Sequence, residues 1–300
     1  MLIFAGNSNL ALGKKVAREL GLTLSELEIH TFPDNENRVR VIDKVVGKDC
    51  IVVQSTGISP NLYYMELFFI LDSLKRSGAK SVTLVIPYLG YQRQDHIFRS
   101  GESVSLEVII NLLSELKVDW AISLDLHSLK IEEFFKLHKI RISHVSALSI
   151  FADKIREMKL KGYVLVSPDM GGIRRIKQVS KMLDNASFIS LEKNRDFKSG
   201  KIKTEKFEGR VQKNAIIIDD VISSGQTLIS AAKILRESGA ENIYVMATHG
   251  IFSGNAPQNL EESIIKKVIV SDTLEIPMDR KFAKLEIVSI SRLISKTLNE

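Results

Sequence analysis

Continuous runs of apolar and β-branched residues alternate along the chain with segments in which apolar residues recur every three or four positions. Runs without a polar residue at every second position are typical of strands that are covered on both faces, as in a parallel sheet. Each run stops at polar residues, which mark the carboxyl end of the strand. The pattern predicts strands over residues 51–56, 81–88, 118–127, 163–169, 215–220, 242–249 and 267–273.

The periodic segments between these runs predict amphipathic helices. Ser59 and Pro60 suit the cap and the first turn of a helix that ends at Gly78. Further helices are predicted over residues 104–116, 171–183 and 227–238.

Strands and helices that alternate in this order predict an α/β fold built from two tandem βαβ arrays. A chain of 300 residues has the size of two ordinary domains. The expected boundary falls near residues 144–149, which gives domains over residues 1–145 and 146–300. The charged segment 194–208 is predicted to be a long loop, a kind of segment that often serves as a lid.

The composition is that of a soluble globular enzyme, with 44% hydrophobic and 26% charged residues. No apolar run is long enough to span a bilayer, and the first residues lack the marks of a secretory signal, so we expect a cytoplasmic protein without a membrane partner. The single cysteine, Cys50, is expected to pack as a small apolar residue. The formal charge of +6 comes from scattered basic residues, and we therefore do not predict binding to nucleic acid.

Polar residues at the strand ends are the first candidates for chemistry, because ligands of open α/β sheets bind beyond the carboxyl ends of the strands. Asp219 and Asp220 directly follow three isoleucines and precede a turn of small and hydroxyl-bearing residues, 223–227, which opens a helix. Such a turn presents backbone N–H groups and a positive dipole end, which suit a phosphate, while the carboxylates suit sugar hydroxyls or a metal. Taken alone, the turn is at least as well explained as a helix-capping cluster.

The whole string 216–228, IIIDDVISSGQTL, resembles the phosphoribosyl-binding loop of the type I phosphoribosyltransferase superfamily. The resemblance implies that the turn holds the phosphate of ribose 5-phosphate and that the two aspartates lie near the ribose. Gln226 stands where glycine is frequent in that superfamily, and Ser224 stands where threonine is usual. The implied contacts to ribose 5-phosphate come from Arg195, Asp219, Asp220, Ser223, Ser224, Gly225, Gln226 and Thr227.

Other segments resemble one branch of that superfamily, the ribose-phosphate pyrophosphokinases. Residues 87–95, PYLGYQRQD, are similar to the PYxxYxRQD signature of this family, and residues 32–36, FPDNE, are similar to its FPDGE motif. Two short motifs, 125–127 and 167–169, resemble its metal-site motifs. The matches run from Gly6 to Asp272 in the order of the family, which implies two tandem type I phosphoribosyltransferase-like domains, each a largely parallel sheet flanked by helices.

The resemblance also implies roles for individual residues. Lys193 and Arg195 match a Lys-x-Arg at the start of a flexible catalytic loop, and two cations delivered by a closing loop are what pyrophosphoryl transfer requires. His127 and Asp169 are the implied residues at Mg²⁺. The implied ATP-binding residues are Phe32, Asp34, Asn35, Glu36, Arg93, Gln94 and Asp95.

The implied reaction is transfer of pyrophosphate from Mg-ATP to the C1 hydroxyl of ribose 5-phosphate, which gives 5-phosphoribosyl 1-diphosphate and AMP for nucleotide biosynthesis. The implied partners are ATP, ribose 5-phosphate, further copies of the chain in a homo-oligomer (a dimer or a hexamer), and inorganic phosphate or ADP as effectors. Two alternatives stay open, a non-catalytic regulatory relative and a phosphoribosyltransferase. The Tyr91–Asp95 segment and the chain length argue against the second, because such enzymes typically have one domain.

Overall fold

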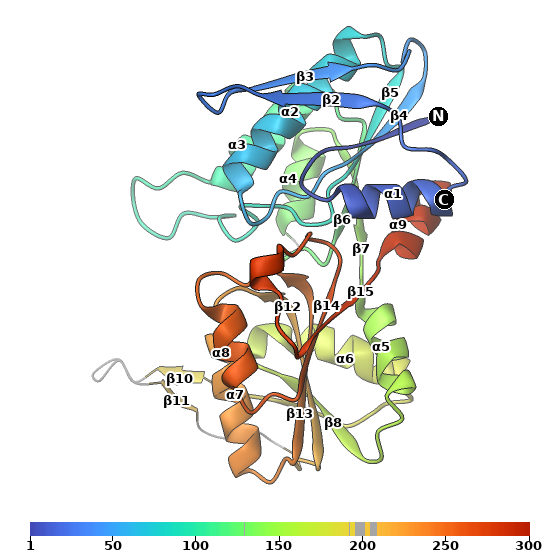
Figure 1. Ribbon diagram of the computed structural model, residues 1–300. Helices are drawn as coiled ribbons and strands as arrows, with labels where there is room; N and C mark the ends of the chain where they lie inside the picture. Colours follow the sequence, from blue (N-terminus) through green and yellow to red (C-terminus); the bar gives the residue numbers. More distant parts are fainter. Residues whose placement is uncertain (129, 192, 196–201, 205–208) are drawn as a thin grey trace. The chain divides into compact units, whose positions relative to one another are not determined.

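The computed structural model (Figure 1) describes residues 1–128, 130–191, 193–195, 202–204 and 209–300, and for 193–195 and 202–204 it describes the backbone alone. The chain forms two compact units. Unit 1 comprises Met1–Ser146 together with Thr273–Glu275 and Ser289–Glu300. Unit 2 comprises Ala147–Asp272 and Ile276–Val288. The sequence predicts a single boundary, whereas the chain passes between the units again near its C-terminal end.

Unit 1 is built on a parallel sheet with the strand order β1-β4-β5-β6-β7. Because neighbouring strands are parallel, their carboxyl ends meet at one edge of the sheet. The strands are β1 (Leu2–Ala5), β4 (Asp49–Val53), β5 (Ser81–Val85), β6 (Trp120–Leu124) and β7 (Arg141–Val145).

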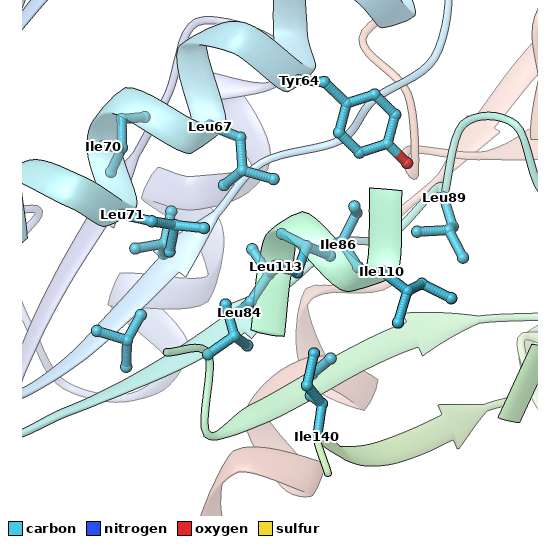
Figure 2. Packing of buried hydrophobic residues seen from close by; sticks show 14 of the residues in the cluster. Tyr64, Leu67, Ile70, Leu71, Leu84, Ile86, Leu89, Ile110, Leu113 and Ile140 are labelled. Carbon is cyan, nitrogen blue, oxygen red and sulfur yellow. The ribbon is translucent and has the colours of Figure 1, made fainter. Parts of the chain in front are cut away.

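Helices α2, α3 and α4 pack their apolar stripes against the strands of this sheet. Leu67 and Leu71 of α2 meet Leu84 of β5 and Ile110 of α3 in one buried cluster (Figure 2). Cys50 is buried in the same cluster, as predicted, and burial raises the pKa of its thiol to about 11. The helices of unit 1 are α1 (Leu10–Glu19), α2 (Pro60–Arg76), α3 (Ser105–Glu115), α4 (Lys130–Leu137) and α9 (Ser291–Asn299).

The apolar pattern did not predict β1, β7, α1 or α4 of unit 1, nor the two features that follow. Strands β2 (Leu27–Thr31) and β3 (Asn37–Val41) form an antiparallel hairpin whose tip carries residues 32–36. The last helix, α9, packs against α1 and β7, and Arg292 of α9 pairs with Glu19 of α1.

Unit 2 is built on a second parallel sheet with the order β15-β14-β13-β12-β8-β9. Leu228 and Leu235 of α7 and Leu260 of α8 pack with Ile217 of β12 in a separate buried cluster. The strands are β8 (Tyr163–Ser167), β9 (Phe188–Ser190), β12 (Asn214–Ile222), β13 (Asn242–Gly250), β14 (Lys267–Ser271) and β15 (Leu285–Val288). The helices are α5 (Leu148–Glu157), α6 (Ile173–Met182), α7 (Gln226–Glu237) and α8 (Ala256–Glu262), and single turns of 3₁₀ helix lie at Met170–Gly172 and Met278–Arg280.

The prediction of a loop over 194–208 is wrong in part. Strands β10 (Lys193–Arg195) and β11 (Ile202–Thr204) pair antiparallel within this segment. Residues 196–201 and 205–208 lie outside the described structure.

The predicted strands and helices are all present, and several predicted strands end a few residues earlier than expected. Residues 54–56, 86–88 and 125–127 leave the ladder to form turns at the strand ends, although they continue the apolar runs in the sequence. The α/β class with two helix-flanked parallel sheets is confirmed. No helix in the described part of the chain combines the length and apolar character needed to cross a membrane.

Candidate functional site

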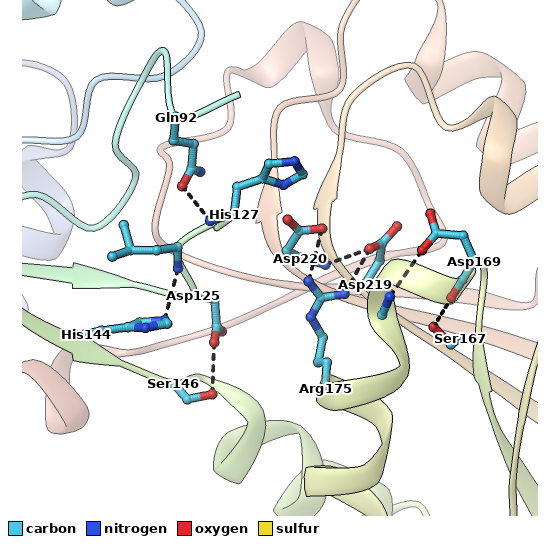
Figure 3. A network of polar contacts seen from close by, with 12 residues as sticks. Gln92, Asp125, His127, His144, Ser146, Ser167, Asp169, Arg175, Asp219 and Asp220 are labelled. Atoms are coloured by element: carbon cyan, nitrogen blue, oxygen red, sulfur yellow. Dashed lines mark hydrogen bonds and ion pairs between the residues drawn. The ribbon is translucent and has the colours of Figure 1, made fainter. Parts of the chain in front are cut away.

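The two adjacent carboxylates of unit 2 lie near the end of β12, beyond the reach of its neighbour β8. Pairing between β12 and β8 stops at Ile217, so the β8 side of Asp219 faces helix α6 instead of a strand. Arg175 of α6 fills this place (Figure 3). Its Nη1 lies 3.1 Å from Asp219 Oδ1, and its Nη2 lies 3.3 Å from Asp220 Oδ1. One guanidinium therefore spans both carboxylates.

Burial of Asp219 is the main reason why its pKa is raised to about 8, and the neighbouring charge of Asp220 adds to the shift. Arg175 acts in the opposite direction. A buried carboxylate pair is costly unless cations or hydrogen-bond donors compensate for the lost water. The oxygens of the pair can accept further hydrogen bonds from donors brought to this end of the sheet.

The residues after β8 fix the start of α6 and therefore the direction of the Arg175 side chain. Asp169 Oδ1 accepts a hydrogen bond from Gly172 N at 3.2 Å, and its backbone carbonyl accepts from Ser167 Oγ at 2.7 Å. A side chain at Gly172 has no room, because its Cβ would lie 2.3 Å from Ser167 Oγ. The predicted metal ligand Asp169 thus also anchors the helix that carries Arg175.

The predicted phosphate turn, 223–227, follows β12 and includes the first two residues of α7. Gly225 caps α7 with φ of +74°, a left-handed conformation that glycine adopts without a steric penalty. Ser223 Oγ lies 3.0 Å from Ser253 Oγ, which ties the turn to the loop after β13. Gln226, the departure from the expected glycine, is the first residue of α7 and is exposed.

In unit 1, the Asp125–His127 turn at the end of β6 is held by three successive backbone N–H groups. Asp125 N donates to Val145 O at 2.9 Å, Leu126 N to His144 Nε2 at 3.0 Å, and His127 N to Gln92 Oε1 at 3.0 Å. His127 itself is exposed, and Gln92 is buried. The motif predicted to bind ATP and the motif predicted to bind metal are therefore connected directly by Gln92.

The segment after β5 contains a left-handed residue, Tyr91 at φ of +61°, and exposes Arg93 and Gln94. Asp95 is buried, and its Oδ1 lies 2.6 Å from His96 Nδ1. Burial of Asp95 opposes ionisation, but hydrogen bonds with His96 and Ser128 outweigh this effect and lower its pKa.

The other predicted ATP-binding residues lie at the tip of the β2–β3 hairpin. Asn35 has φ of +69°, so asparagine does take the left-handed conformation for which the family uses glycine. Phe32 N donates to Glu36 O at 2.8 Å, and Glu36 N donates to Asp34 Oδ1 at 3.2 Å. The side chains of Phe32, Asp34, Asn35 and Glu36 are all exposed.

Lys193 and Arg195 form the ends of β10, and their backbones pair with Thr204 and Ile202 of β11. Their side chains lie outside the described structure. Thr248 and His249 are fully buried within β13.

Sequence reasoning missed Arg175 and Gln92. The signal for Arg175 was a basic residue one helical turn after the Gly171-Gly172 pair that follows Asp169. Gln92 lies inside the nine-residue signature, but only its burial shows that it supports a neighbouring turn.

The described residues contain no cluster of three or more histidine, cysteine, aspartate or glutamate side chains placed to hold a metal. Mg²⁺ commonly keeps several waters and is held by one or two carboxylates together with substrate phosphates. The carboxylate of Asp169 fits such a site, in which a nucleotide supplies most of the ligands.

The fold and these strand-end residues define a class of protein, an α/β protein with a carboxylate pair and a helix-opening turn of small residues at the carboxyl end of a parallel sheet. Residues 1–116 match the N-terminal domain of ribose phosphate pyrophosphokinase, and residues 205–300 match the phosphoribosyl synthetase-associated domain. The chain belongs to the ribose-phosphate pyrophosphokinase family.

Relatives match over almost the whole chain. A ribose-phosphate pyrophosphokinase of Fusobacterium nucleatum is 35% identical over 300 residues, which cover 99% of this chain and 93% of the relative. One of Bacillus caldolyticus is 34% identical over 297 residues, with 99% and 93% covered. A crystal structure of phosphoribosylpyrophosphate synthetase from Mycobacterium smegmatis superposes with a TM-score of 0.91 at 32% identity, and the match covers 99% of this chain and 97% of that one.

Proposed function

We propose that this chain is a ribose-phosphate diphosphokinase, which transfers the pyrophosphoryl group of Mg-ATP to the C1 hydroxyl of ribose 5-phosphate. The observation that carries the proposal is the arrangement at the end of β12, where two further strand residues separate the Asp219–Asp220 pair from the Ser223–Thr227 turn at the start of α7. Carboxylates that need donors and a turn at a helix N-terminus suit the hydroxyls and the phosphate of one ribose phosphate.

ATP binding is proposed for residues of unit 1. The exposed tip of the β2–β3 hairpin offers the Phe32 ring for stacking and Asp34 and Glu36 as acceptors for the adenine amino group. Arg93 and Gln94 are exposed and provide donors for the nucleotide phosphates.

The chemical step balances without a covalent enzyme intermediate. The C1 oxygen of ribose 5-phosphate attacks the β-phosphorus of ATP, the bond from that phosphorus to the oxygen bridging the α- and β-phosphates breaks, and AMP leaves. The hydroxyl proton is released to solvent. The chain contributes positioning and charge neutralisation, for which Lys193 and Arg195 are the proposed cationic groups. Asp169 in unit 2 and His127 in unit 1 are each proposed to hold Mg²⁺ together with substrate phosphates, and the ion would supply further neutralisation of those phosphates.

The proposal includes a homo-oligomer, a dimer or a hexamer, and inorganic phosphate or ADP as effectors. Light scattering after size exclusion tests the oligomeric state. Initial rates with and without phosphate or ADP test whether these ions act as effectors.

Incubation of the purified chain with ATP, Mg²⁺ and ribose 5-phosphate tests the activity, and AMP is the diagnostic product. We expect AMP only when ribose 5-phosphate is present. A chain that binds both substrates but forms no AMP in any condition is a non-catalytic relative, and the proposal is then wrong.

A further inference from the structure

His144 connects the Asp125–His127 turn with helix α4. The residue lies on β7, with its Cα opposite Ser123 of β6. Its Nε2 accepts the hydrogen bond from Leu126 N at 3.0 Å, and its Nδ1 lies 3.2 Å from Glu132 Oε1. About a quarter of the His144 side chain is exposed, and Glu132 has a similar exposure of 30%. The contacts are therefore partly shielded from solvent.

These two contacts define which ring nitrogen carries the proton. Because a backbone N–H can only donate, Nε2 must be the acceptor and Nδ1 must carry the hydrogen. Nδ1–H then donates to the Glu132 carboxylate, which stabilises this tautomer. Glu132, His144 and Leu126 thus form one directed chain of hydrogen bonds from α4 to the turn.

The turn needs such support because its backbone is strained. Asp125 has φ of +34°, in the left-handed half of conformational space, which an aspartate occupies at an energetic cost. Ser146 Oγ donates to Asp125 Oδ1 at 2.9 Å on one side of the turn, and Gln92 holds His127 N on the other. Leu126 lies between these two anchors, and its N–H depends on His144.

We propose that His144, oriented by Glu132, is a positioning residue. It holds the Asp125–His127 turn in the conformation in which His127 can bind the nucleotide-bound metal. The inference rests on the proposed function, because it assigns His127 to that metal. His144 touches the backbone of the turn and acts through it. Loss of the contact therefore leaves the ribose 5-phosphate residues of unit 2 unchanged while it weakens metal binding and turnover.

The test compares His144→Gln with His144→Leu. Glutamine places an amide oxygen near the position of Nε2 and can still accept from Leu126 N, whereas leucine cannot. Groups that orient metal ligands typically contribute about 10- to 100-fold to metal affinity or activity, so we expect His144→Leu to lower kcat by about that factor and His144→Gln to recover most of it. His138→Leu is the matched control, because the His138 ring makes no hydrogen bond among the described residues.

A second readout does not depend on turnover. Mn²⁺ binding to the protein in complex with α,β-methylene-ATP, followed by electron paramagnetic resonance, should weaken in His144→Leu, while the Kd for ribose 5-phosphate from calorimetry stays at the wild-type value. Glu132→Leu, on the surface of α4, should weaken Mn²⁺ binding in the same direction and serves if His144→Leu does not fold.

The outcomes separate the inference from the proposed function. Wild-type kcat and Mn²⁺ binding in a folded His144→Leu or Glu132→Leu protein overturn the role of His144 and leave the diphosphokinase proposal intact. A wild-type protein that forms no AMP overturns the diphosphokinase proposal, whereas the Mn²⁺ comparison still decides whether His144 supports a metal-binding turn.

Discussion

Arg175 Nη1 lies 3.1 Å from Asp219 Oδ1, and this contact joins the start of α6 to the end of β12. The same guanidinium reaches Asp220, so a single cation compensates two adjacent carboxylates. All three side chains are mostly buried, so removal of the guanidinium would leave two buried carboxylates without their cation. Arg175 therefore favours the ionised form of Asp219, against the effects of burial and of the neighbouring Asp220.

Replacement of Arg175 by methionine, which keeps the length of the side chain and removes the charge, is expected to weaken ribose 5-phosphate binding. Hydrogen bonds to charged groups contribute about 1.5–3 kcal/mol, which corresponds to about a 10- to 100-fold rise in Kd. Arg175→Lys retains one cation and should show a smaller rise. Calorimetric titration of both variants gives the comparison, and an unchanged Kd in Arg175→Met contradicts this role.

The raised pKa of Asp219 predicts a pH-dependent loss of stability. The pKa of this carboxyl is near 3.8 in the unfolded chain and about 8 in the folded protein. Between these values the folded protein holds a proton that the unfolded chain has released, so the free energy of unfolding falls as the pH rises through this window. The asparagine of Asp219→Asn cannot ionise, so the free energy of unfolding of this variant should not show that fall.

Thermal unfolding of the wild type and of Asp219→Asn, followed from about pH 5 to about pH 9, measures this effect. The Tm difference should shift in favour of Asp219→Asn as the pH rises. Asp153→Asn, a change at an exposed aspartate of the same unit, is the control. A Tm difference that is independent of pH excludes a raised pKa for Asp219.

Gln92→Met should destabilise unit 1, because it removes the acceptor for His127 N without a large change in volume. Loss of one intramolecular hydrogen bond costs about 0.5–1.5 kcal/mol. Gln92→Glu keeps an oxygen at that position and should cost less. Urea denaturation of the two variants provides the free energies of unfolding, and equal values would show that the Gln92–His127 contact does not stabilise the turn.

Lys193→Ala is expected to lower turnover by about 10²- to 10³-fold, which is typical for removal of one group that stabilises charge in a transition state. Its Tm should stay close to that of the wild type. Lys203→Ala is a matched control, because Lys203 lies on the partner strand β11 of the same hairpin, opposite Asn194. Near wild-type turnover in Lys193→Ala would contradict the catalytic role proposed for Lys193.

The apolar runs predicted the main strands of both sheets, because a strand covered on both faces must be apolar throughout. The same argument placed the Asp219–Asp220 pair and the Asp125–His127 turn within a few residues of the strand ends. Short elements such as β1 and β15, with four residues each, carry too few residues for a clear period. The packing of α9 in unit 1 depends on contacts with α1, which are distant in sequence.

The supporting residues of the site were harder to predict for a physical reason. Arg175 reaches the aspartates only because Asp169 and Gly172 set the direction in which α6 begins. His144 supports the Asp125–His127 turn only because β6 and β7 are neighbours in the sheet. Both contacts depend on the tertiary arrangement. In the sequence alone, an arginine or a histidine at these positions is equally consistent with an exposed surface residue.

The central claim is that the group transferred from ATP is pyrophosphoryl, and ATP labelled with ³²P at the β-phosphorus tests it most directly. After incubation with Mg²⁺ and ribose 5-phosphate, we predict that the label appears in a ribose product and that unlabelled AMP forms in equal amount. Label recovered in ADP would show transfer of the γ-phosphoryl group alone and would contradict the account.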